Sequence, residues 1–398
     1  MTIDKNAYAS FLEKVAEDID IAPGKYQQAV DRYKAVGHWL EDGEYPGCAD
    51  APDIYPQGSF RLGTVVRPIR GGKEADYDID LVCELPIAKD RTDARAVKWM
   101  VGDRLREHDR YRRMLDDEGK RCWTLEYAEQ DGIGFHLDVL PSVPDSQHAF
   151  DKSIAITNRQ GAFYDWSASN PKGYGDWFDE KNRAAFIRVL AEQKRSIRAR
   201  ATTIYASVDD VPDQLVRTPL QRSIQIMKRH RDVMFNGGTG ADYAPISMIV
   251  TTLAAHLYGT EPDVYSALTA IVSKLHGHAG LVENRSIEVA LASLGLIQRT
   301  RDGKWYIGNP VNPAENFADR WHEDNHARAR AFFQWVDALQ EDLVDILEEN
   351  RLGTARNRLR AALGAAAVTA HLGLVTLTEA AAAPARVHIG GAARPWRP

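Results

Sequence analysis

The 398-residue sequence contains only three cysteines, and no two of them form a Cys-x-x-Cys pair. This odd, scattered set (Cys48, Cys83 and Cys122) supports neither a disulfide framework nor a structural zinc site. Apolar runs long enough to cross a bilayer are missing, and the N-terminus shows no secretory signal. From these absences we expect a cytoplasmic protein without a membrane partner.

A surplus of positive charge is also missing. Lys and Arg total 50 against 56 Asp and Glu, which gives a formal net charge of −6. Nonspecific nucleic-acid binding over the whole surface is therefore not expected, and we predict no obligatory nucleic-acid template; a local basic groove stays open as an alternative. Apolar residues make up 44% and charged residues 27%, which is typical of a globular protein with two domains or one bilobal unit.

The most informative segment covers residues 57–85, where acidic and apolar residues alternate. A strand points successive side chains to opposite faces, so Asp78 and Asp80 are expected on one face while Ile79 and Leu81 enter the core. Two ionised carboxylates this close repel each other unless a cation lies between them. Asp76 has the same parity, but it follows a charged stretch and is expected to mark the strand entry.

A metal-dependent site with two divalent ions needs further hard oxygen ligands. Asp138 is the polar member of the otherwise apolar strand pattern GFHLDVL, and its alternative is an exposed aspartate on an edge strand. The preceding Asp-x-Asp pair favours the first interpretation. The sequence therefore predicts two Mg²⁺ ions, with Mn²⁺ as a substitute, held by Asp78, Asp80 and Asp138.

A Gly58-Ser59 turn precedes the carboxylate pair by about twenty residues. Glycine allows the backbone to approach phosphate oxygens, and serine adds a hydroxyl and an amide N–H, so the turn is a candidate phosphate cradle. Arg61 is a candidate for contacting a triphosphate, with an ordinary surface arginine as the alternative.

Periodicity and turn residues divide the chain into an N-terminal lobe with two N-terminal helices, which carries the aspartates (1–165), a helical lobe (166–363) and an Ala-rich flexible tail (364–398). Thr218, Pro219 and Gln221 have the pattern of a helix start with a capping box. The expected elements are helices within 5–42, 91–116, 176–206, 263–277, 284–294, 316–348 and 351–363, a helix that starts at Thr218, another that starts near Pro245, and strands at 122–127 and 134–140.

Three short segments, QGSFRLGT, DYDIDLV and HLDVLP, together resemble the DNA polymerase β-like nucleotidyltransferases. More narrowly, the chain resembles the bacterial cGAS/DncV-like enzymes (CD-NTases), which make cyclic oligonucleotide signals in CBASS anti-phage systems. TPLQRSIQIMKRHRD, YAPISMIVTTLAA and NPVNPAENFADRW extend the resemblance over roughly residues 25–350. It implies an α+β bilobal fold, with an N-terminal mixed sheet plus helices and a C-terminal helical lobe.

The resemblance also implies roles for individual residues. Gly58 and Ser59 would hold the donor triphosphate, with Lys228 and Ser247 contributing from the second lobe. Without the resemblance, Lys228 is equally a solvated lysine in a basic run and Ser247 a packing serine. Asn309, Asn312 and Asn316 are candidates for positioning the acceptor nucleotide or for capping turns, and Trp166 and Tyr174 for stacking on a base or for packing.

The implied reaction joins nucleoside triphosphates (ATP and/or GTP) into a cyclic di- or trinucleotide that acts on a downstream effector. Two alternatives stay open: a nucleotidyltransferase that extends RNA or another macromolecule, and a non-catalytic scaffold that retains the fold.

Overall fold

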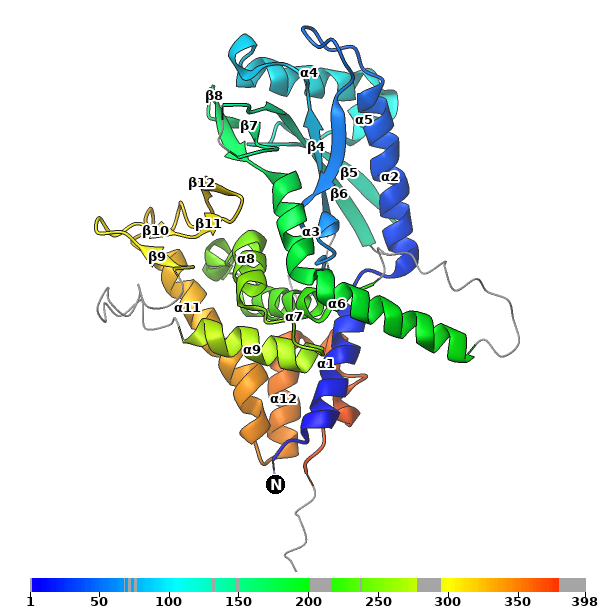
Figure 1. Ribbon diagram of the computed structural model, residues 1–398, viewed down its shortest axis with the longest axis vertical. Coiled ribbons are helices and arrows are strands. Elements are labelled where there is room, and N and C mark those ends of the chain that lie inside the picture. Colours follow the sequence, from blue (N-terminus) through cyan, green and yellow to red (C-terminus); the bar gives the residue numbers. More distant parts are fainter. Residues whose placement is uncertain are drawn as a thin grey trace, which may run out of the picture.

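The computed structural model describes residues 2–67, 69–70, 73–74, 77–130, 133–147, 150–200, 216–236, 238–277 and 295–378 (Figure 1). A sheet with helices forms the upper lobe in this view, and a bundle of helices forms the lower lobe. This is the predicted α+β arrangement. In the part of the chain described here, no helix is both long and apolar enough to span a bilayer.

The main sheet is mixed, as expected, and its strands run in the order β1-β4-β6-β7-β8, with β5 also paired to β6. Only β4 and β6 are parallel within it; the other pairs are antiparallel. The strands are β1 (Asp53–Gln57), β4 (Tyr77–Glu84), β5 (Trp123–Gln130), β6 (Ile133–Pro144), β7 (Ile154–Gln160) and β8 (Phe163–Ser169). A separate short hairpin joins β2 (Ile69–Arg70) to β3 (Lys73–Glu74).

One face of the sheet is covered by helices. The side chains of Ile79 and Leu81 share a core with apolar residues of α2 (Pro23–Glu41) and α4 (Ala94–Glu107). Instead of one helix over 91–116, the chain forms a 3₁₀ turn (Lys89–Arg91), α4 and α5 (Asp109–Met114). The break lies at His108, whose extended backbone ends α4 and whose Nδ1 accepts the Arg110 N–H at 3.2 Å.

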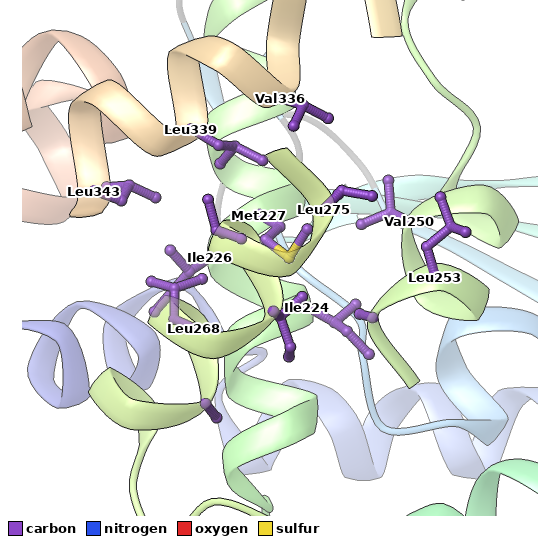
Figure 2. Packing of buried hydrophobic residues seen from close by; sticks show 14 of the residues in the cluster. Ile224, Ile226, Met227, Val250, Leu253, Leu268, Leu275, Val336, Leu339 and Leu343 are labelled. Carbon is purple, nitrogen blue, oxygen red and sulfur yellow. The ribbon is translucent and has the colours of Figure 1, made fainter. Parts of the chain in front are cut away.

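The helical lobe is built around α7 (Pro219–Met234), whose apolar side chains meet those of the surrounding helices (Figure 2). The predicted capping box is confirmed, because the Thr218 and Gln221 side chains each accept a hydrogen bond from the other's backbone N–H. The surrounding helices are α1 (Lys5–Ile19), α8 (Ser247–Leu257), α9 (Val264–His276), α11 (Ala327–Leu339) and α12 (Leu352–Leu363). The long α6 (Pro171–Arg200) follows β8.

Two stretches differ from the expected elements. The segment after Pro141, for which the sequence predicts no strand, continues β6 and then forms the β7–β8 hairpin. The expected helix over 316–348 starts only at Ala327, because Asn325 and His326 have left-handed backbones and short strands precede them. These strands are β9 (Gln298–Arg299), β10 (Trp305–Tyr306), β11 (Gly308–Asn309) and β12 (Asn312–Asn316). The expected helix at 284–294 lies outside the described residues.

The prediction of a flexible tail from residue 364 is wrong for residues 364–378. This segment contains α13 (Ala365–Val368) and a 3₁₀ turn (Leu372–Leu374), and it ends beside the N-terminus through an Ile3–Leu377 bridge. Val368 and Val375 are fully buried in the helical-lobe core. The apolar side chains that interrupt the alanines therefore anchor the segment, and residues 379–398 lie outside the described part.

Candidate active site

The strand register brings the three predicted aspartates together. Asp80 on β4 lies directly opposite Asp138 on the parallel strand β6, and Asp78 lies opposite His136. Paired residues of neighbouring strands point to the same side of a sheet, so all four side chains lie on the face opposite the helix-covered core. The prediction that these aspartates share one face is therefore confirmed, whereas Asp76 lies outside the described residues.

Burial and nearby negative charge both change the ionisation of Asp80. Burial is the largest cause, and the charges of Asp138 and Asp78 add to it, so the pKa of the Asp80 carboxyl rises to about 7; Lys228 opposes the rise. Asp78 is half-exposed, and its Oδ1 lies 4.0 Å from Nδ1 of His136. A positive charge placed between these carboxylates would relieve their repulsion.

Asp138 is oriented by a neighbour that the sequence analysis missed. Thr124 on β5 pairs with Asp138 in the antiparallel register, and its hydroxyl donates to Asp138 Oδ1 at 2.5 Å. The pattern CWTLEY predicts a strand but not which residue lies opposite Thr124, because that partner depends on the hairpin register. Thr124 thus limits the rotation of the third carboxylate.

The Gly58-Ser59 turn lies against the carboxylate pair, at the junction between β1 and the short helix α3 (Gly58–Arg61). Gly58 has a left-handed backbone (φ +62°), and a Cβ added there would overlap the Oδ2 atom of Asp80. Glycine is required here for two reasons, the backbone conformation and the closeness of Asp80. The predicted neighbourhood of turn and aspartates is present.

Lys228 on α7 is fully enclosed rather than solvated. Its Nζ donates to the carbonyl oxygen of Thr64 at 3.0 Å and lies 3.2 Å from the Thr64 hydroxyl. Burial, with a smaller contribution from Arg231, lowers the pKa of Lys228 to about 7, and Asp80 is among the acidic groups that oppose the shift. The alternative of a solvated lysine is therefore wrong.

Ser247 is the first residue of α8, as the sequence predicted for the first turn of that helix. Its Oγ accepts a hydrogen bond from Arg231 Nη1 at 3.1 Å, so a cation that the sequence analysis did not single out lies beside it.

Arg61, a candidate for contacting a triphosphate, is paired with an acidic residue in this structure. Its guanidinium forms a two-pronged ion pair with Asp179 on α6, at 2.6 Å and 3.3 Å, which joins α3 to the start of the helical lobe.

A cavity of about 230 Å³ opens between the sheet and the helical lobe, and Gly58, Arg61 and Asp80 from the predicted set line it. Its wall also includes Arg121, Asn309 and Glu315, of which only Asn309 had been considered. A larger cavity of about 390 Å³ lies on another side of Arg61, among α2, α3, α6 and the start of α7. Asp78, Asp80 and Asp138 are not among the residues that line it, so the smaller cavity, which Asp80 borders, is the candidate active site.

The other weighed residues have structural roles. Asn316 Oδ1 accepts from the backbone N–H groups of Ile307 and Ala318, as the turn-capping alternative predicted. Tyr174 is buried, and its hydroxyl is 2.8 Å from that of Thr252, although its side chain also borders the cavity. Trp166 is partly buried against the sheet-lobe core.

The donor set fits a hard divalent cation, since Asp78, Asp80 and Asp138 supply carboxylate oxygens on one face, and burial together with their repulsion raises the pKa of Asp80. Among the described residues, however, no three His, Cys, Asp or Glu side chains converge as a ready-made metal site. The three aspartates would hold such an ion after their side chains close toward it.

Comparison with known proteins shows the family. Residues 52–141 match the family model described as "Cyclic GMP-AMP synthase DncV-like, nucleotidyltransferase domain", and they include Gly58 and the three aspartates. A c-di-GMP synthase from Roseivirga ehrenbergii is 30% identical over 352 residues, which is 87% of this chain and 82% of that protein. The cyclic dinucleotide synthase CdnG from Bradyrhizobium diazoefficiens is 26% identical over 331 residues, 78% of this chain and 70% of that protein.

Comparison with solved structures finds one of the same relatives. The structure of the Bradyrhizobium diazoefficiens CD-NTase CdnG in complex with GTP superposes with a TM-score of 0.67 at 23% identity, covering 92% of this chain and 98% of that chain. The chain belongs to the cGAS/DncV-like nucleotidyltransferases, the CD-NTases, and is a nucleotidyltransferase with the polymerase β-like fold.

Proposed function

We propose that the protein joins nucleoside triphosphates, ATP and/or GTP, into a cyclic di- or trinucleotide, without a template and with release of pyrophosphate. The observation that carries this proposal is the in-register pair Asp80 and Asp138, with Asp78 on the same face and the Gly58 turn against Asp80. A dinucleotide product is favoured, because the relatives described above are named as a c-di-GMP synthase and a cyclic dinucleotide synthase.

Asp78, Asp80 and Asp138 would hold two Mg²⁺ ions, or Mn²⁺ in their place. When bound, such ions activate an acceptor hydroxyl and neutralise the leaving pyrophosphate. The backbone at Gly58 and Ser59 would contact phosphate oxygens beside the carboxylates. Positioning and charge stabilisation carry most of a phosphoryl-type transfer, so the contribution of the chain is mainly geometric.

The helical lobe would supply the opposite wall for the triphosphate. Lys228 is held at the Thr64 segment that follows the Gly58 turn, and Arg231 and Ser247 meet at the start of α8. The N–H groups and dipole of a helix start favour an anion, and Arg231, which is ion-paired with Asp232 at 2.6 Å, lies there as well. Arg61, although paired with Asp179, borders the same cavity and could exchange that partner for a phosphate.

The biological role that we propose is anti-phage signalling of the CBASS type, in which the cyclic product activates a downstream effector. This follows from the family to which the chain belongs. We also propose that the enzyme works in the cytoplasm, where nucleoside triphosphates are available and where its free cysteines stay reduced.

The test is to incubate the full chain with labelled ATP, GTP, CTP and UTP and Mg²⁺ or Mn²⁺, to treat the mixture with phosphatase, and to resolve the products. A phosphatase-resistant cyclic product is expected, and it should disappear in a double variant with Asp78→Asn and Asp80→Asn. Asp103→Asn is the matched control, because Asp103 is exposed on α4 and pairs with its helix neighbour Arg106. Synthesis by the double variant, or incorporation only into added RNA, would contradict the proposal.

A further inference from the structure

The cavity beside Asp80 is also lined by a second carboxylate, Glu315, which is not suited to binding a phosphate. Glu315 lies on β12, in a separate strand pair of the second half of the chain, and lines the same cavity as Gly58 and Asp80. In Figure 1, β11 and β12 lie next to the sheet lobe, and β12 contacts β8. A negatively charged group at this place repels a triphosphate, so its role must concern another part of the nucleotide.

Glu315 is held in place by hydrogen-bond donors. Asn309 Nδ2 donates to Glu315 Oε2 at 2.8 Å, and the Asn309 Oδ1 atom accepts the backbone N–H of Val311 at 3.0 Å. This second bond fixes the amide orientation, so Asn309 can present only its donor to Glu315. Burial, with a small contribution from Asp319, raises the pKa of Glu315 above its usual value, and the Asn309 bond, the charge of Arg121 and the Ser169 hydroxyl oppose this rise.

The walls near Glu315 suit a base. Leu140 and Ile156 line the cavity from the sheet, and both are largely buried in a small apolar cluster. Met248 lines it from the helical lobe. Apolar walls with a few convergent polar groups are typical of sites that bind a flat organic ring and read its edge.

Hydrogen-bond chemistry then selects the base. An ionised carboxylate only accepts, and it has about four lone-pair sites, so Glu315 retains capacity beyond its bonds to Asn309 and Ser169. Guanine alone among the four bases offers two adjacent donors, N1–H and the N2 amino group, on its pairing edge. Adenine and cytosine would place a ring-nitrogen acceptor against the carboxylate, and uracil offers one donor between two acceptors. The guanidinium of Arg121 is suited to the acceptor atoms O6 and N7 of guanine.

We propose that Glu315 is a specificity-determining residue that accepts hydrogen bonds from N1–H and N2–H of a guanine, with Asn309 as its positioning residue. The inference rests on the proposed function, because it names one of the nucleotides that the active site takes. The enzyme then requires GTP at one of its two nucleotide positions.

The test measures binding rather than turnover. The full chain with Mg²⁺ is titrated with the α,β-methylene analogues of GTP, ITP and ATP, which cannot react. ITP lacks only the N2 amino group, so wild-type protein should bind the GTP analogue most tightly, the ITP analogue less tightly and the ATP analogue least. A bidentate contact to a base supports about 10-fold to 100-fold discrimination.

Glu315→Gln replaces one acceptor by a donor without changing shape. It should weaken the GTP analogue by about 10-fold to 100-fold and leave ATP-analogue binding unchanged or improved, since an amide can pair with adenine. Asn309→Ala should reduce the GTP-to-ITP ratio by a smaller factor. Glu323→Gln is the control, because Glu323 is exposed and pairs with Arg320 in the same part of the chain.

Equal loss for all three analogues in Glu315→Gln, or no loss for any, would overturn the guanine assignment. Equal affinity of wild-type protein for the GTP and ITP analogues would overturn it without any variant. The two proposals fail separately. Guanine preference without a cyclic product contradicts only the proposed synthase, whereas a cyclic product without guanine preference contradicts only the role of Glu315.

Discussion

The two faces of strand β4 place opposite demands on the same eight residues. Toward the helices, Ile79, Leu81 and Cys83 are almost completely buried in the sheet-lobe core. Toward the cavity, Asp78 and Asp80 lie beside Asp138, and burial together with the neighbouring charges raises the pKa of Asp80. The first face gains stability from apolar burial, while the second spends part of it to hold like charges together. The difference shows that apolar packing on the helix-covered face of β4 stabilises the strand, and that the repelling aspartates on its other face do not.

The largest expected effect comes from the cavity face. Asp80→Asn should reduce nucleotidyl transfer by more than about 100-fold, since loss of even the outer partners of metal ligands costs 10- to 100-fold. The variant should nevertheless be at least as stable as the wild type at pH 8 without metal, because the repulsion is gone. Activity is measured with the cyclic product assay and stability with urea denaturation.

The sign of the pH effect follows from the pKa of Asp80. Its folded-state value of about 7 lies above the ordinary 3.8, so its contribution to stability is full below about pH 4 and is lost as the pH rises through 7. The metal-free wild type should therefore lose up to a few kcal/mol across this window, and Asp80→Asn should lose less. An equal pH dependence in both proteins would contradict the raised pKa of Asp80.

On the helix-covered face, a substitution should lower stability and leave activity unchanged. Leu81→Ala removes a fully enclosed side chain between α-helices and sheet, and it should reduce the free energy of unfolding by about 2–5 kcal/mol. Activity per folded molecule at low temperature should stay near the wild-type value, because Leu81 points away from the carboxylates. A large loss of activity in fully folded Leu81→Ala protein would show that the two faces are not independent.

The sequence alone predicted which residues of β4 face the cavity, because that pattern depends only on neighbouring residues. The alternation around Asp78 and Asp80 needs only the two-residue period of a strand, and the capping box at Thr218 needs only four residues. Thr124 and Glu315 were missed because their positions at the site depend on strand register and on the packing of a distant strand pair. The packed segment 364–378 was missed since its alanine content obscured the few apolar anchors.

Gly58→Ala tests the contact between the turn and the carboxylate pair. The left-handed backbone at Gly58 costs a residue with a Cβ about 1–2 kcal/mol, and the added methyl group would push against Asp80. We expect a stability loss of that size together with weaker activity, since Asp80 must move. Gly47→Ala is a control for backbone strain alone, because Gly47 also has a positive φ but has open space around it. Equal activity in both variants would contradict a special role for the Asp80 contact.

The smallest expected effect concerns the orientation of the third carboxylate. Thr124→Val keeps the shape of the side chain but removes the hydroxyl that donates to Asp138 Oδ1 at 2.5 Å. A lost hydrogen bond to a charged group costs about 1.5–3 kcal/mol in isolation, but Asp138 can turn toward other donors, so we expect a stability change near the lower figure and about a tenfold drop in turnover. Thr124→Ser retains the hydroxyl and should restore turnover, although it loses a methyl group. If Thr124→Val keeps wild-type turnover while Thr124→Ser loses it, the methyl packing of Thr124 matters and its hydrogen bond does not, and Asp138 is then oriented by the strand register alone.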